Sequence, residues 1–214
     1  MQDNNSYSIV DLTISLMVIF ILLFIMMLNK THQDFVNSPQ QTRKNLVSAL
    51  RENNIEATLE ETDPLSVQFN LAEDKLTFKY NDYSLSPAGE QFLSSFIPEF
   101  ANTICEGDLA DSLQSVQIVG HTDSIASDEY NLELSQQRAL EVMLYALTQT
   151  NLSEKHQECL FKLISVNGRG ERELLPKGAV AGQENRAKSR RVEFKIRVKS
   201  FEEKQALLNQ FKDS

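Results

Sequence analysis

The 214-residue chain has only two cysteines and three histidines, and it contains no block of lysine and arginine. Cys105 and Cys159 lie far apart without a C-x-x-C pair or a histidine cluster, so no metal site is predicted. A formal net charge of −9 without a basic block excludes nucleic acid as an expected partner. In an oxidising compartment the cysteines either pair or stay free, because sequence alone does not give the distance between their Cα atoms.

The usual catalytic sets are also missing. His32, His121 and His156 are scattered, and no Ser-His-Asp or Cys-His motif accompanies them. The glycines at 168 and 170 are not followed by G-K-[ST], which excludes a phosphate-binding loop. We therefore expect neither an enzyme nor a cofactor. His121, next to the TD motif discussed below, either senses pH or packs at the end of a strand.

One long apolar run is present near the N-terminus. Residues 1–8 form a polar leader without lysine or arginine, and residues 9–28 are almost wholly apolar. Twenty residues at about 1.5 Å each match a hydrocarbon core of about 30 Å, which predicts a transmembrane helix. The uncharged leader and the length of the run argue against a cleaved signal peptide. Asp11 lies inside this run, where a carboxylate either handles ions or sits in the headgroup region.

Residues 29–70 are predicted to be a juxtamembrane linker. Pro39 and many polar residues favour a linker, although Leu46, Val47 and Leu50 would share one face of a short helix over 42–53. Residues 55–69 contain strand-like pieces on either side of an Asp63-Pro64 turn. Their role stays open.

The centre of the chain places an acid and a guanidinium on neighbouring elements. Residues 116–119 read as a buried strand, and Leu134, Arg138, Val142 and Ala146 recur at helical spacing after a cap at Asn131 or Ser135. Asp123 therefore follows a strand end, and Arg138 lies early in a helix. The two side chains form either an internal salt bridge or a site for a zwitterionic ligand.

The remaining pattern predicts an α+β domain over residues 71–200. Strands are expected at 76–80, 161–166 and 192–198, with a helix capped by Ser86, a short helix at 185–189 and a C-terminal helix within 201–214. The order is β–α–β–α–β–(α)–β. The helices are expected on one face of the sheet.

Three motifs together resemble OmpA-like peptidoglycan-binding domains: TD at 122–123, NLELSQQRA at 131–139 and SRRVEF at 189–194. The resemblance implies that Asp123 and Arg138 hold the diaminopimelate of the wall's stem peptide. It extends the peptidoglycan-binding set to Thr122, Asn131, Leu134, Ser135 and Arg190. Ser189 departs from the asparagine usual in this family, and strand alternation lets at most one of Arg190 and Arg191 reach the site.

An aspartate early in a single span, followed by such a domain, resembles the B-type subunits of ion-driven stators. These include the flagellar MotB family and, closer in its short leader, ZorB of the Zorya anti-phage systems. The resemblance implies that Asp11 carries H⁺ or Na⁺, that a second copy forms a dimer, and that a multi-helix ZorA/MotA-like ring surrounds it. A static tether between membrane and wall remains the alternative.

The same resemblance implies a single-pass protein of the bacterial inner membrane, with a cytoplasmic N-terminus and a periplasmic domain. The charge pattern predicts the opposite orientation. Lys30, Arg43 and Lys44 follow the apolar run, whereas the leader has no basic residue. For the orientation implied by the resemblance to hold, a partner with many helices would have to determine how the chain inserts into the membrane.

Overall fold

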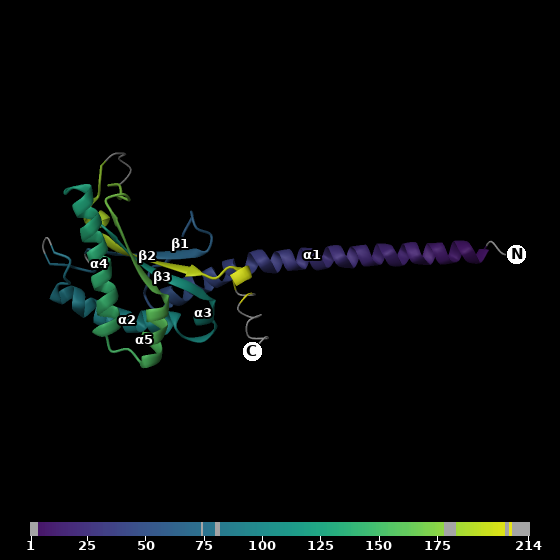
Figure 1. Ribbon diagram of the computed structural model, residues 1–214, viewed down its shortest axis with the longest axis horizontal. Helices are drawn as coiled ribbons and strands as arrows, with labels where there is room; N and C mark the ends of the chain where they lie inside the picture. Colours follow the sequence, from purple (N-terminus) through teal and green to yellow (C-terminus); the bar gives the residue numbers. More distant parts are fainter. Residues whose placement is uncertain (1–3, 74, 80–81, 178–182, 204–205, 207–214) are drawn as a thin grey trace.

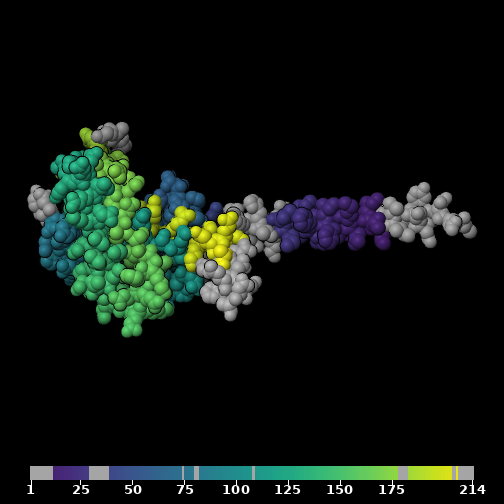
Figure 2. Space-filling model, viewed as in Figure 1, coloured from purple at the N-terminus to yellow at the C-terminus, as the bar shows by residue number. Residues whose placement is uncertain are grey.

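The computed structural model describes the backbone of residues 4–73, 75–79, 82–177, 183–203 and 206. The side chains of residues 4–11, 29–38 and 108 are outside the described part. A long helix, α1, projects from a domain of mixed helices and strands, and the N-terminus lies at its far end (Figure 1). The space-filling view shows the described apolar part of this helix as a rod clear of the domain (Figure 2).

The helix α1 (Asn4–Glu52) runs for 49 residues without a break. Residues 29–41, which were predicted to be a polar linker, are therefore helical. The helix predicted over 42–53 is present, but it continues α1 and is not a separate element. Residues 29–41 contain no glycine, and Pro39 removes only one backbone donor from the helix. Leu46, Val47 and Leu50 are buried against the domain, so packing holds the end of α1 in place.

The domain contains a five-stranded sheet in the order β1-β2-β5-β3-β4. Strands β3 and β4 are parallel, and the other neighbours are antiparallel. The strands are β1 (Thr58–Leu59), β2 (Ser66–Ala72), β3 (Leu113–His121), β4 (Ile164–Gly170) and β5 (Arg191–Val198).

The first long strand is not the one predicted at 76–80. Strand β2 pairs with β5 from Ser66 to Ala72, whereas Phe78 forms only an isolated bridge with Leu85. Tyr80 lies outside the described residues. The strand-like pieces around the Asp63-Pro64 turn are thus β1 and β2, and the packed unit begins well before the predicted boundary at residue 71.

Two of the predicted helix starts are confirmed. Ser86 caps α2 (Pro87–Ile104) by accepting from the Gly89 amide, and Asn185 caps α6 (Arg186–Ser189). The short helix α3 (Gly107–Ser112) follows α2 directly in the chain.

The other two helices correct the prediction. Ser127 caps α4 (Asp128–Thr148), so Asn131 and Ser135 lie within the helix, where both are buried. The helix α5 (Glu154–Leu163) covers the first half of the strand predicted at 161–166, because Ser153 caps it and helical bonding continues to the start of β4.

One face of the sheet carries the core. Alternate residues of β5 (Val192, Phe194, Ile196 and Val198) are buried in a single apolar cluster with residues of α1, α2, α4 and α5. Phe194 stacks on Phe69 with ring centroids 5.0 Å apart. This confirms a mixed helix and sheet domain with the core on one face. The predicted C-terminal helix lies mostly outside the described residues.

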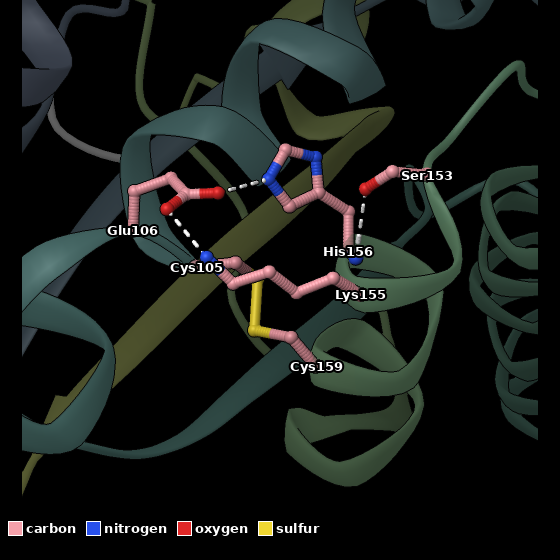
Figure 3. The surroundings of a disulfide bond; sticks show 6 residues. All are labelled: Cys105, Glu106, Ser153, Lys155, His156 and Cys159. Carbon is pink, nitrogen blue, oxygen red and sulfur yellow. Dashed lines mark hydrogen bonds and ion pairs between the residues drawn. A yellow bond between two sulfur atoms is a disulfide. The ribbon is translucent and has the colours of Figure 1, made fainter.

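A disulfide joins Cys105 to Cys159, whose Cα atoms are 6.0 Å apart. Cys105 ends α2, and Cys159 lies inside α5. Above the sulfurs, Glu106 accepts from Lys155 at 2.6 Å and contacts His156 at 2.8 Å (Figure 3). A covalent bond and two polar contacts thus fasten α5 to the end of α2.

The large apolar residues of α1 between positions 12 and 28 are all exposed, from 45% for Ile21 to 73% for Phe20. Among the residues that the structure describes, no helix is both long enough and apolar enough to cross a membrane. The span over 9–28 stays a prediction. Asp11 lies in α1 with its side chain outside the described part, so its role as an ion carrier also stays a prediction.

Candidate ligand-binding site

A pocket of about 470 Å³ opens where the end of β3, the start of α4 and α6 come together. Six of the seven residues predicted to bind peptidoglycan line it, together with Glu73, Phe78 and Arg186, which were not predicted. The six are Thr122, Asp123, Asn131, Leu134, Arg138 and Arg190.

Two glycines bring α4 against the sheet. A Cβ atom on Gly120 would lie 2.0 Å from the Ser135 carbonyl oxygen, and one on Gly168 would lie 2.6 Å from the Gln136 nitrogen. The Ser135 hydroxyl accepts from the Gly170 amide at 2.9 Å. Ser135, the seventh predicted residue, is therefore buried between helix and strand and does not line the pocket. It positions the first turns of α4, which carry Arg138 to the pocket.

Asp123 lies just after β3 and is bonded by two arginines. Its Oδ2 accepts from Arg190 Nη1 at 2.7 Å and from Arg186 Nε at 3.2 Å. Burial raises the pKa of the Asp123 carboxyl, but these hydrogen bonds lower it by more, and the net pKa lies below its ordinary value. Asp123 is therefore a carboxylate at any physiological pH.

Arg138 is not paired with Asp123. Its Nε and Nη2 both donate to the Asp82 carbonyl oxygen at 3.2 Å, and its guanidinium lies 4.9 Å from the centre of the Phe78 ring. Burial lowers the pKa of Arg138, which nevertheless stays a cation because arginine titrates far above neutral pH. Among the described residues no carboxylate forms a salt bridge with it. The internal Asp123–Arg138 salt bridge, one of the two open alternatives, is absent here.

The two neighbouring arginines of the third motif point to different partners. Arg190 joins Asp123 to Glu73, and its Nε donates to Glu73 at 2.8 Å. The first cause of its raised pKa is this bond to Glu73. Arg191 is buried and donates to the Glu173 carbonyl oxygen at 3.1 Å. Of these two neighbours, only Arg190 therefore bonds Asp123 of the TD motif.

Thr122 and Asn131, two polar residues of the motifs, differ in their hydrogen bonding. Thr122 is 3% exposed, and its hydroxyl has no hydrogen-bond partner among the described residues. Asn131 donates to Glu171 at 2.6 Å and to the Ala126 carbonyl oxygen at 3.3 Å. Thr122 thus has a free donor at the pocket, whereas Asn131 braces the loop before α4.

Sequence reasoning missed Glu73 and Arg186. Glu73 follows β2, which was not recognised as a strand of this sheet, and Arg186 opens a short helix that was predicted without a role. No spacing in the sequence connects either residue to Asp123. With them the pocket has two carboxylates, Glu73 and Asp123, and five cationic side chains, a set that suits a ligand with both charges. The five are Lys79, Arg138, Arg186, Arg190 and Arg191.

A second polar cluster lies at the wall of the pocket, where His121 is one of the lining residues. His121 is 2% exposed and stands between the carboxylates of Glu173 and Glu193. One ligand atom from each residue falls within 4.8 Å of the other two, which is close enough for one ion. Spacing in the sequence gave no sign of this grouping.

The sequence profile described as "OmpA family" matches residues 77–189, just over half of the chain. Outer membrane protein A of Shimwellia blattae is 39% identical over 80 residues, which are 37% of this chain and 30% of that protein. The chain therefore spans well under two thirds of this relative.

Two solved structures are similar in fold. The cell wall anchor of the type VI secretion system from Pseudomonas aeruginosa has a TM-score of 0.44 and 22% identity, over 73% of this chain and 97% of that one. The periplasmic domain of Helicobacter pylori MotB has a TM-score of 0.48 and 15% identity, over 73% and 97%. Similarity at this level says nothing about what this chain binds.

Proposed function

The chain belongs to the OmpA family, and on that premise we propose that its pocket binds the peptidoglycan stem peptide. The diaminopimelate of that peptide is a zwitterion, with an ammonium and carboxylates on one residue. Asp123 is the acceptor for the ammonium, and Arg138 is the donor for a carboxylate.

The observation that carries this proposal is the unpaired state of Arg138 beside a carboxylate that is held ionised. Arg138 bonds only a backbone carbonyl among the described groups, so its guanidinium keeps donors for a ligand. The free hydroxyl of Thr122 adds a further polar group at the same pocket. A salt bridge made only for stability would instead satisfy both side chains within the chain.

Sedimentation of the full-length protein with purified peptidoglycan tests the proposal. Asp123→Ala and Arg138→Ala should each weaken the apparent affinity for peptidoglycan by about tenfold or more, because each removes a charged hydrogen bond worth about 1.5–3 kcal/mol. Glu158→Ala and Lys162→Ala remove the same charges from an exposed ion pair on α5 and should leave binding unchanged. Wild-type binding by both pocket variants would refute the ligand assignment.

We further infer that the protein is the B-type subunit of an ion-driven stator in the bacterial inner membrane. The apolar residues of α1 between positions 12 and 28 are exposed and point in all directions around the helix, as in a helix surrounded by apolar neighbours. Asp11, at the start of that run, would carry H⁺ or Na⁺ through a ZorA/MotA-like ring, with a second copy beside it. The wall-bound domain would keep the complex from turning.

Zorya-type phage defence is the biological setting that we propose, and flagellar rotation is the alternative. Cells carrying this gene and its genomic neighbours should lose protection from phage with Asp11→Asn at equal membrane levels. Asp34→Asn, which changes an aspartate beyond the apolar run, should keep it. Full protection with Asp11→Asn would leave a static membrane-to-wall tether. Protection in neither strain would point to motility or envelope maintenance.

A further inference from the structure

His121 is the last residue of β3 and is buried without a hydrogen bond. Its side chain points away from the apolar core, since Ile118 and Gly120 face that core. Neither Nδ1 nor Nε2 has a hydrogen-bond partner among the described residues. Buried polar groups are nearly always bonded, so an imidazole in this state indicates a missing partner.

Two carboxylates face the imidazole from different segments. Glu193 Oε2, on β5, lies 3.4 Å from Nε2, and Glu173 Oε2, in the turn after β4, lies 3.9 Å from Nδ1. Donor atoms that share one metal ion at about 2.0–2.2 Å each lie about 3–3.6 Å apart. The two observed separations involve opposite ring nitrogens, and one ion can bind only one of them. With a single imidazole nitrogen the three ligand atoms lie within 4.8 Å of one another, so side-chain rotation has to bring both carboxylates to that nitrogen.

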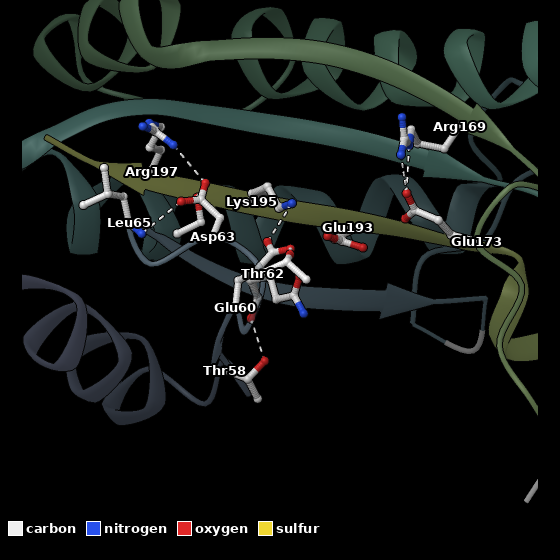
Figure 4. A network of polar contacts seen from close by, with 12 residues as sticks. Thr58, Glu60, Thr62, Asp63, Leu65, Arg169, Glu173, Glu193, Lys195 and Arg197 are labelled. Carbon is white, nitrogen blue, oxygen red and sulfur yellow. Dashed lines mark hydrogen bonds and ion pairs between the residues drawn. The ribbon is translucent and has the colours of Figure 1, made fainter. Parts of the chain in front are cut away.

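The second oxygen of each carboxylate is already held. Arg169 donates to Glu173 Oε1 at 2.9 and 2.6 Å, and Figure 4 shows this pair near the β5 residue Glu193. The Gln68 amide, oriented with its nitrogen toward the acids, donates to Glu193 Oε1 at 3.2 Å. Outer hydrogen bonds of this kind orient the ligands of metal sites. They leave both Oε2 atoms directed at His121.

We propose that His121, Glu173 and Glu193 bind one divalent transition-metal ion, with Zn²⁺ as the best match. One imidazole nitrogen and two carboxylate oxygens are ligands that Zn²⁺ accepts, and water would complete four-coordination. The two carboxylates offset the charge of the ion.

Arg191 is the nearest competitor for this position. Its Nη2 is 3.7 Å from Glu193 Oε2, beyond hydrogen-bond distance. Its Nη1 is directed instead to the carbonyl oxygens of Glu173 and Ser189, at 3.1 and 3.4 Å. Arg191 therefore forms a long ion pair with the oxygen that faces His121, and a metal ion would have to compete with it for Glu193.

The ion would tie the connection after β4 to the sheet. That connection begins beside Glu173 and leads to α6, which supplies Arg186 to the pocket. His121 lies two residues before Asp123. Zinc would thus brace one wall of the ligand pocket, and its binding does not depend on the proposed function.

Zinc binding to the purified full-length chain, measured against a chromogenic chelator without peptidoglycan, tests the proposal. One Zn²⁺ per chain should bind, and Glu173→Gln and Glu193→Gln should each weaken binding by about tenfold or more. Glu173 is half-exposed, so its variant keeps the fold testable. Two control variants on α5 should bind zinc like the wild type. They are Glu158→Gln, at an exposed position, and His156→Gln, beside Glu106.

The imidazole signals in an NMR titration locate the ion. Zn²⁺ should shift the His121 signal at one equivalent and leave His156 unchanged. Three results would overturn the proposal: no zinc binding, binding that only His156→Gln removes, or a His121 ring that stays doubly protonated at pH 7 in the presence of zinc. The last would mean that a proton, and not a metal, joins the two carboxylates.

Discussion

The two ends of α1 differ sharply although they belong to one helix. Between residues 12 and 28 its large apolar side chains are 45–73% exposed, whereas Leu46 and Leu50 are fully buried in the domain. In the first region apolar residues surround the helix, and in the second they form one face. One end is therefore suited to apolar surroundings and the other to a water-soluble core, and a single helix connects them.

Arg43 strengthens the packed end. It is buried and donates to the carbonyl oxygens of Ser66, Pro64 and Glu60, at 3.0, 2.8 and 2.9 Å. These carbonyls belong to the turn between β1 and β2. The helix is thus fixed to the edge of the sheet by apolar packing and by three polar contacts, so α1 and the domain should move together at this joint.

The largest effect should come from Leu50→Ala at the packed end. It should lower the free energy of unfolding of the domain by about 2–5 kcal/mol, because it leaves a cavity in the core. Leu22→Ala, in the exposed segment, should change it by less than about 0.5 kcal/mol. Urea unfolding of both full-length variants, followed by circular dichroism, would show whether the two ends differ. Equal losses of unfolding free energy would contradict the difference between the packed end and the exposed segment of α1.

Loss of the disulfide should have the next largest effect. Cys105 and Cys159 are 54 residues apart in sequence, and opening that loop should reduce stability by about 2–4 kcal/mol. The paired Cys105→Ser and Cys159→Ser variant should unfold at lower urea, and adding reductant should then have no further effect. A wild-type protein that is insensitive to reductant would show that the bond does not stabilise the domain.

Arg43→Met should reduce stability by about 1–3 kcal/mol, since three carbonyls lose a buried donor while the aliphatic packing is kept. Lys44→Met removes the same charge at the neighbouring exposed position and should change little. The same unfolding measurement distinguishes them. Equal effects of the two substitutions would mean that Arg43 does not fix the helix to the sheet.

The smallest effect should be a pH dependence at Asp123. Its folded-state pKa lies below the ordinary 3.8, so its contribution to stability is complete above pH 3.8 and is lost as the pH falls through the folded value. The difference in unfolding free energy between wild type and Asp123→Asn should therefore be constant above that pH and shrink below it. A difference that grows on acidification would contradict the assigned ion pairs.

Much of the domain could be predicted because its local patterns agree with its packing. The alternation in β5 and the helical spacing of Val142 and Ala146 identified elements whose buried faces the structure confirms, whereas Leu134, at the same spacing, is half-buried at the pocket. The cap at Ser86 was equally local. Where prediction failed, distant partners decided: β2 is a strand because β5 pairs with it, and α1 is continuous because Leu46 and Leu50 pack on the domain.

The candidate site likewise combines residues that local motifs identified with residues that only the fold brings together. Asp123 and Arg138 were located by motifs on β3 and α4, and the structure brings both to one pocket. Glu73 and Arg186 come from segments with no recognisable motif, and the grouping of His121 with Glu173 and Glu193 depends on the sheet register and the turn after β4. Such partners follow from the fold and not from spacing along the chain.

Titration of the full-length protein with a diaminopimelate-containing stem peptide, followed by NMR, tests the central claim most directly. Saturable shifts of the Arg138 side chain and the Asp123 backbone should appear in the wild type and vanish in Arg138→Gln, while Lys162→Gln binds normally. Saturable binding that survives Arg138→Gln, or shifts confined to residues outside the pocket, would contradict it.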